Sequence, residues 1–211
     1  VGEGSTQQLK AFFETIGVSG AEWMPACQAT YKTGIEFRRW STRPGFERYF
    51  HPFSTEVDDR TAPALYFNSY VRRKGADVPG HPDGYFLATE LARQKLAPLP
   101  AWSFPFATHY GYHFDSSQIG RFLRGHAGAR GVQHIEATVQ DVEQSAEGDI
   151  QALLCSDGRR IEGDFFVDST GFRSLLLQQK LGVPFVSFAD NLYNDSAVVL
   201  QTPNEDRKSV V

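Results

Sequence analysis

Three short stretches of this chain combine residue types that could carry out chemistry. The first is a turn at residues 168–174, where small polar residues and a glycine follow an apolar segment and precede a helical pattern. A strand that ends in this way presents backbone amides and a helix dipole to an anion such as a phosphate. A simple polar connection between a strand and a helix is the alternative interpretation.

The second stretch surrounds Lys32. Apolar and polar residues alternate from Tyr31 to Phe37, which predicts a strand with one polar face, and Lys32 lies on that face near a glycine. Because burial shifts the pKa of an amine, a lysine at such a place could orient or activate a small oxidant or a carbonyl. The structural alternative is a lysine on a solvated strand face.

The third stretch is an aromatic run around His51. Tyr49 and Phe50 precede this histidine, and Phe53 follows it closely. Such a cluster could stack against a flat aromatic ligand and shape its pocket. It could equally belong to the hydrophobic core, and both interpretations stay open at this point.

Neither a metal site nor a disulfide framework is expected. His109 and His113 have the i, i+4 spacing of a zinc-binding helix, but no glutamate accompanies them and a glycine lies between them. The two cysteines, Cys27 and Cys155, are far apart in the chain. We interpret them as structural thiols of a protein in a reducing compartment.

Composition excludes several broad classes of protein. The 211 residues are 41% hydrophobic and 22% charged, with a net charge of −4, as in an ordinary globular protein. The acidic balance disfavours a nucleic-acid partner, and no apolar run is long enough to cross a bilayer. We expect a cytoplasmic protein without an export leader or membrane partner; the oligomeric state is not indicated.

Periodic patterns predict mixed secondary structure and the α/β (mixed α+β) class. Residues 4–17 indicate a helix in which Ser5 and Gln8 have capping-box spacing. Asp115 and Gln118 have the same spacing before a second helix that would end at Gly131. A further helix is expected near residues 85–96.

The remaining patterns predict strands and an irregular layer. Strands are expected at 132–142, 150–155, 159–163 and, buried, at 165–167, with a hairpin turn at Asp157-Gly158 and a short helix ending near residue 181. Eight of the eleven prolines fall within residues 41–111. That density predicts a loop-rich layer, and such layers often carry function.

Read in order, several segments resemble the flavin-dependent tryptophan halogenase family, and together they cover nearly the whole chain. The matching segments are Val1-Gly2-Glu3-Gly4, Glu22-Trp23-Met24, residues 31–37 with Trp40, Phe50-His51-Pro52-Phe53, Tyr112-His113-Phe114-Asp115, Arg130-Gly131-Val132, residues 168–173 and residues 194–198.

The resemblance implies part of a flavin monooxygenase-like FAD-binding fold. Residues 1–40 and 112–185 would form its flavin-side core, and residues 41–111 the substrate-side layer. In this family FADH2 and O2 oxidise chloride or bromide to hypohalous acid, which a lysine directs onto an electron-rich aromatic substrate such as tryptophan or indole. Lys32 matches that catalytic lysine, which would hold the oxidant by a hydrogen bond or as a chloramine.

The resemblance also assigns contacts with the small molecules. His51 and Phe53 match the residues that flank the flat substrate. The positions that match contacts with FAD are Glu3, Gly4, Val139, Thr170 and Gly171. A separate flavin reductase would supply the reduced FAD, because nothing in the sequence resembles a nicotinamide site.

Two family motifs do not occur in the sequence, namely G-x-G-x-x-G and W-x-W-x-I-P. We therefore expect an internal fragment of a longer enzyme, and we expect this chain alone to bind FAD weakly and to be inactive. Two other hypotheses remain. One is a flavin-dependent monooxygenase or reductase of the same superfamily, which would not need a lysine at position 32. The other is a non-catalytic fragment that acts as an interaction module.

Overall fold

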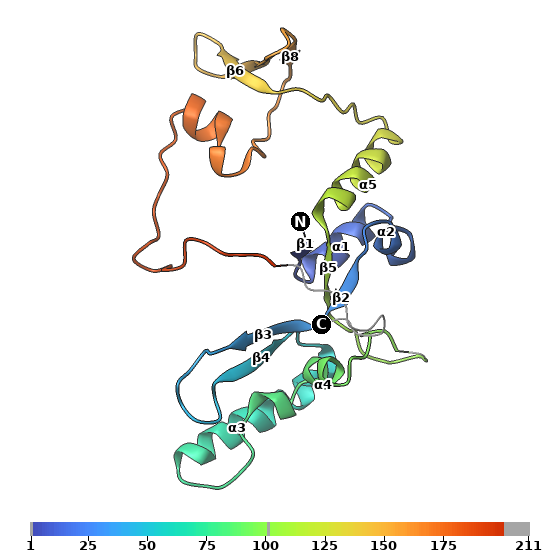
Figure 1. Ribbon diagram of the computed structural model, residues 1–211, viewed down its shortest axis with the longest axis vertical. Coiled ribbons are helices and arrows are strands. Elements are labelled where there is room, and N and C mark those ends of the chain that lie inside the picture. Colours follow the sequence, from blue (N-terminus) through green and yellow to red (C-terminus); the bar gives the residue numbers. More distant parts are fainter. Residues whose placement is uncertain (1, 101, 201–211) are drawn as a thin grey trace. The chain divides into compact units, whose positions relative to one another are not determined.

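The computed structural model describes residues 2–100 and 102–200 and divides the chain into two compact units (Figure 1). The first unit runs to Ala127 and includes residues 199–200, and the second runs from Gly128 to Val198. Helices and strands are mixed in the chain, which confirms the predicted fold class. No helix in the described ranges is long and apolar enough to cross a membrane.

A three-stranded antiparallel sheet is central to the first unit, with strand order β1-β5-β2. Its strands are β1 (Gly2–Gly4), β5 (Gly111–Asp115) and β2 (Thr30–Lys32), and two helices, α1 (Gln8–Thr15) and α2 (Gly20–Ala26), follow β1 in the chain. Phe13 of α1 stacks on the fully buried Trp23 of α2, with ring centroids 4.2 Å apart. Trp23 meets Tyr112 of β5 edge-on at 4.8 Å, so an aromatic core joins the helices to the sheet.

The predicted capping box at the first helix is wrong. The Ser5 amide donates to the Tyr112 carbonyl oxygen at 2.8 Å, and the Ser5 hydroxyl accepts from the Tyr112 amide at 3.0 Å. Ser5 therefore extends the pairing of β1 with β5, and the helix begins only at Gln8. The local capping pattern is misleading here, because Ser5 is hydrogen-bonded to Tyr112, which lies far away in the sequence.

The predicted strand over residues 31–37 is divided between two sheets. Its first part is β2, and its second part, β3 (Gly34–Arg38), pairs with β4 (Arg48–Pro52) in an antiparallel hairpin. A Cβ atom at Gly34 would lie 2.4 Å from the His51 carbonyl oxygen and 2.5 Å from the Phe50 ring. The chain can approach β4 this closely only because position 34 is a glycine.

Residues 41–111, predicted as a loop-rich layer with short strands or helices, contain short helical segments and one helix of 12 residues. Beside α4 (Leu87–Arg93), which confirms the helix expected near 85–96, this region holds the 12-residue α3 (Ala62–Arg73) and the short 3-10 turns η1 (Glu56–Arg60) and η2 (Pro82–Gly84) (Figure 1). Pro63 lies in the first turn of α3, where a missing amide costs nothing. Pro63 therefore belongs to the start of a helix, although a high density of prolines generally indicates loops.

The helix predicted after Asp115 is α5 (Ser116–Gly128). The Gln118 amide donates to the Asp115 carboxylate at 2.8 Å, which confirms Asp115 as its capping residue. The helix ends at Gly128, before the expected stop at Gly131.

The second unit contains an antiparallel sheet in the order β6-β7-β8. Its strands are β6 (Val139–Gln144), β7 (Ile150–Cys155) and β8 (Arg160–Glu162). Gly158 has φ of 85°, the left-handed conformation that the hairpin turn requires, so the predicted hairpin is confirmed. The strand expected at 132–142 begins only at Val139. Two short helical segments, η3 (Gly171–Arg173) and η4 (Leu175–Lys180), follow β8 in the chain.

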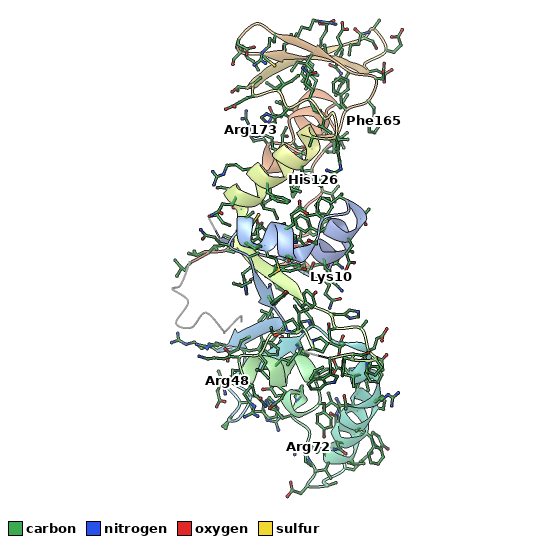
Figure 2. The ribbon with its side chains drawn as sticks, turned by 90° about the vertical axis from the view of Figure 1, so that its right-hand side faces the viewer. Lys10, Arg48, Arg72, His126, Phe165 and Arg173 are labelled. Carbon is green, nitrogen blue, oxygen red and sulfur yellow. The ribbon has the colours of Figure 1, made fainter. Side chains whose placement is uncertain are left out.

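The prediction of a buried strand at residues 165–167 is wrong. Phe165 and Val167 are 85% and 74% exposed, and this segment pairs with no strand in the part of the chain that the structure describes (Figure 2 labels Phe165). A run of apolar residues becomes a strand only when another strand satisfies its backbone groups.

Candidate functional site

The sheet of the first unit places Lys32 and His113 on the same face. The register pairs Lys32 with Gly111, and it pairs His113 with Thr30 on one side and Gly4 on the other. Directly paired residues point to one face, and residues two apart along a strand do the same. Lys32 and His113 are therefore diagonal neighbours on adjacent strands.

The opposite face of this sheet packs onto the aromatic core. Tyr112 and Phe114 of β5 meet Trp23 with ring centroids 4.8 Å and 6.4 Å away, and Tyr31 of β2 lies 6.0 Å from Tyr112. The alternation of Tyr31 and Lys32 thus separates a core face from a polar face, as the sequence predicted for these two residues.

Gly4 leaves room for the two polar side chains. A Cβ atom at this position would lie 3.1 Å from the Lys32 Nζ and 3.2 Å from the His113 Cδ2. The Lys32 Nζ is also 5.8 Å from the centroid of the Phe53 ring, a distance at which an ammonium is attracted to an aromatic face. Of the residues singled out in the sequence, Gly4, Lys32 and Phe53 are brought together.

Burial controls the charge of both groups. Desolvation lowers the pKa of Lys32. The pKa of His113 is lowered by desolvation and, secondly, by the positive charge of Lys32. Because both shifts favour the neutral form, the imidazole and the amine each lose a proton more readily than the same group in water.

His51 and Glu3 occupy different surroundings from Lys32. His51 lies in β4 opposite Ile35, and its side chain is exposed. Glu3 lies opposite Phe114, so it belongs to the other face of the sheet from Gly4 and its carboxylate is exposed. The neighbouring positions 3 and 4, predicted together as contacts with FAD, thus serve opposite faces of one strand.

The other predicted FAD contacts belong to the second unit. Val139 begins β6 opposite Cys155 and is half-buried. Thr170 is exposed, and its hydroxyl donates to the Asp168 carboxylate at 2.6 Å and accepts from the Leu175 amide at 2.8 Å. Gly171 has φ of +65°, and a Cβ atom there would have nothing within 4 Å.

Asp168 accepts hydrogen bonds from amides just beyond the turn at residues 168–174, the turn predicted to bind an anion. The Asp168 carboxylate accepts from the Leu176 amide at 3.0 Å and from the Leu177 amide at 2.9 Å. An aspartate already neutralises the start of this helical segment, so a phosphate would compete with it.

His113 is the member of this cluster that sequence reasoning missed. In the sequence it belongs to the matching segment Tyr112-His113-Phe114-Asp115 and has zinc-pair spacing with His109. Neither observation gives it a role beside Lys32, because the sequence does not predict the pairing of β5 with β1 and β2. The signal lay in the alternation of residues 111–115, which places His113 on the face opposite two aromatic residues.

Cys27 and Cys155 are buried free thiols, as expected, and burial raises the pKa of Cys27, with a smaller effect from the charge of Asp115. In the described ranges no three His, Cys, Asp or Glu residues are grouped to hold a metal ion.

Known proteins are similar to this chain along its whole length. The tryptophan halogenase family model matches residues 1–211. The 7-chloro-L-tryptophan 6-halogenase of Kutzneria sp. (strain 744) is 36% identical over 100% of this chain and 44% of its own length. The tryptophan 7-halogenase of Lentzea aerocolonigenes is 31% identical over 98% of this chain and 41% of its own length.

Solved structures agree. A flavin-dependent halogenase from Xanthomonas campestris is 37% identical, with a TM-score of 0.71 over 87% of this chain and 36% of its own. A flavin-dependent halogenase from Brevundimonas sp. BAL3 is 32% identical, with a TM-score of 0.75 over 90% of this chain and 39% of its own. The chain thus spans less than half the length of these relatives. Since a single family model covers it from end to end, the chain belongs to the tryptophan halogenase family.

Proposed function

We propose that this chain supplies the lysine-bearing part of an FADH2-dependent halogenase that acts on an electron-rich aromatic compound such as tryptophan or indole. The observation that carries the proposal is the position of Lys32. Its partly buried amine lies over the space at Gly4 and beside the Phe53 ring. An amine that is both desolvated and next to an aromatic wall suits the transfer of a halogen to a flat ring.

Reduced FAD and O2 would supply the chemistry that oxidises chloride or bromide to hypohalous acid. Within the first unit, the exposed carboxylate of Glu3 would contact FAD. Within the second unit, Gly171 would do so with a backbone that no neighbouring atom covers. A separate flavin reductase in the same cytoplasmic compartment would reduce the FAD, which reaches the enzyme by diffusion.

Lys32 would then hold the oxidant against the substrate. A hydrogen bond from the amine to the oxygen of hypohalous acid makes the halogen more electrophilic, because oxygen leaves more readily when it receives a proton. The ring carbon forms a bond to the halogen and loses its own proton, and water is released. A neutral Lys32 amine could alternatively carry the halogen as a chloramine. Phe53, with His51 two residues before it, would flank the ring of the substrate.

The test is a halogenation assay of the full-length protein and of its Lys32→Met variant. Both are given FADH2, O2, bromide or chloride, and tryptophan or indole, and products are identified by mass spectrometry. We expect the variant to lose the halogenated product while consumption of reduced FAD continues. Lys10→Met is the matched control, because Lys10 of α1 (labelled in Figure 2) contacts the Tyr110 ring, which packs against the aromatic core and not against Lys32.

Three outcomes would overturn the proposal. A Lys32→Met variant that halogenates at the rate of the unmodified protein would remove Lys32 from the chemistry. A product that carries a hydroxyl group and no halogen, formed with or without halide, would favour a flavin-dependent monooxygenase. Absence of any product together with absence of FAD binding would favour a non-catalytic role.

A further inference from the structure

We infer that His113 is a positioning residue for Lys32: its imidazole lies beside the Lys32 amine and, through one bridging water molecule, holds that amine over Gly4. The role in catalysis rests on the proposed function of Lys32. The pairing itself rests on the sheet, and the two can be tested separately.

Strand register brings the two side chains to one place. His113 lies in the central strand, between Gly4 of β1 and Thr30 of β2, and Lys32 is the next residue of β2 on that face. Diagonal neighbours of this kind are within reach of each other when the side chains are long.

Gly4 gives the pair its shared space. The point where a side chain at position 4 would begin lies 3.1 Å from the Lys32 Nζ, 3.2 Å from the His113 Cδ2 and 3.6 Å from the His113 Nε2. Both nitrogen atoms therefore border the same opening. The described residues show no direct hydrogen bond between them, and one water molecule in the opening would join them.

Electrostatics favours a neutral imidazole that acts as an acceptor. An imidazolium beside the Lys32 ammonium would place two positive charges in a partly desolvated space, and burial together with the lysine charge lowers the pKa of His113 accordingly. A neutral histidine with its proton on Nδ1 presents the lone pair of Nε2 to the O–H group of such a water, which in turn accepts from the amine. One hydrogen of the amine would thus be engaged, and the remaining positions of Nζ would be left for the oxidant.

Other charged groups near β5 have different partners or lie on the other face. Asp115 shares the His113 face, but its carboxylate accepts from the Gln118 amide at the start of α5. Glu3 of β1 belongs to the opposite face. From α1, Lys10 lies over the Tyr110 ring and is paired with Glu14 at 3.6 Å. Lys32 is accordingly the charge that acts on His113.

The pairing is tested by the titration of His113, followed by NMR in the absence of FAD. In Lys32→Met the pKa of His113 should rise, by roughly half to two pH units for a charge removed at this range, because a nearby positive charge is gone. Lys10→Met should leave the titration unchanged. Equal midpoints in the unmodified protein and in Lys32→Met would overturn the inference.

The positioning role is tested with two substitutions of His113. His113→Gln keeps a hydrogen-bond acceptor but cannot titrate, whereas His113→Leu removes the acceptor. We expect His113→Gln to retain halogenation and to lose the decline in rate at acidic pH, and His113→Leu to lose rate by roughly tenfold, the worth of one hydrogen bond. The same order should appear in the acylation rate of the Lys32 amine, measured by peptide mass spectrometry on the folded protein.

The two proposals fail in different ways. If Lys32→Met still halogenates but shifts the His113 titration, the pairing stands and the proposed function falls. If Lys32 is essential but His113→Leu matches the unmodified protein in both rate and amine reactivity, the positioning role falls. A circular dichroism spectrum and a Tm close to those of the unmodified protein show that each variant is folded.

Discussion

The backbone amide of Phe53 donates a hydrogen bond to the carbonyl oxygen of Thr33 at 2.8 Å, which fixes the aromatic ring to the residue that follows Lys32. The hairpin of β3 and β4 spans the two positions, so its register decides that the Phe53 ring lies 5.8 Å from the Lys32 Nζ. The β3–β4 hairpin therefore positions the Phe53 ring beside Lys32, although the two residues are far apart in the sequence.

Removal of the Phe53 ring should destabilise the first unit. Phe53 is only 7% exposed, so Phe53→Ala should lower the free energy of unfolding by roughly 3–5 kcal/mol through lost burial and a cavity. Urea unfolding followed by fluorescence measures the change. Tyr66 is 71% exposed, and Tyr66→Ala should change stability by no more than about 0.5 kcal/mol. Equal effects of the two substitutions would contradict the structure.

Asp58 should stabilise the segment that follows Phe53. Its buried carboxylate accepts from the Thr55 amide at 2.7 Å, the Thr55 hydroxyl at 3.1 Å and the Leu87 amide at 2.9 Å. Asp58→Ala leaves these donors without an acceptor and should cost roughly 3 kcal/mol in urea unfolding. The neighbouring Asp59 is exposed, and an Asp59→Ala variant that proved just as unstable would argue against a specific role for Asp58.

Gly111, the strand partner of Lys32, should tolerate no side chain. A Cβ atom there would lie 2.5 Å from the Ser5 carbonyl oxygen and 3.1 Å from the Thr6 carbonyl oxygen, so Gly111→Ala forces the backbone apart. We expect its Tm to fall by roughly 4 °C or more in a thermal melt. Gly120 in α5 has open space at the same position, and Gly120→Ala should be neutral or stabilising by up to about 1 kcal/mol. A Gly111→Ala protein with an unchanged Tm would show that Gly111 lies farther from the Ser5 and Thr6 carbonyl oxygens than the structure indicates.

Features set by neighbours in the sequence could be predicted. The Asp157-Gly158 turn needs a positive φ at Gly158, and Asp115 needs only the amide of Gln118, so both were recognised. The alternation of Tyr31 and Lys32 was also sufficient to separate a core face from a polar face. In each case the stabilising partner is a few residues away, or the pattern itself carries the information.

Features set by distant partners could not be predicted. Ser5 has a good local capping pattern, yet its hydroxyl accepts from the Tyr112 amide instead. The opposition of His113 to Gly4 and Thr30 depends on which strands pair, and an isolated sequence does not specify that register. The sequence therefore indicates Lys32 and Gly4 only as separate candidates, and the sheet register brings them together with His113.

Asp168 should make the turn of the second unit sensitive to acid. Its carboxylate accepts from the Thr170 hydroxyl at 2.6 Å and from the Leu177 and Leu176 amides at 2.9 Å and 3.0 Å. These hydrogen bonds, the one from Thr170 first, lower the pKa of Asp168 to about 2. A lowered carboxyl pKa stabilises the folded turn above the ordinary value near 3.8, and that stabilisation is lost as the pH falls toward 2.

The expected result is a loss of order confined to this turn between about pH 4 and pH 2. Amide hydrogen exchange at Leu176 and Leu177 should accelerate over that range, because a protonated carboxyl is a weaker acceptor than a carboxylate. Asp168→Asn should exchange rapidly at every pH, whereas Asp164→Asn, at a position outside this network, should behave like the unmodified protein. If exchange at these two amides is independent of pH and of Asp168 after correction for the intrinsic rate, then the amides are protected by another acceptor and are not held by the aspartate. In that case Asp168 would not be the group that orders the start of this helical segment.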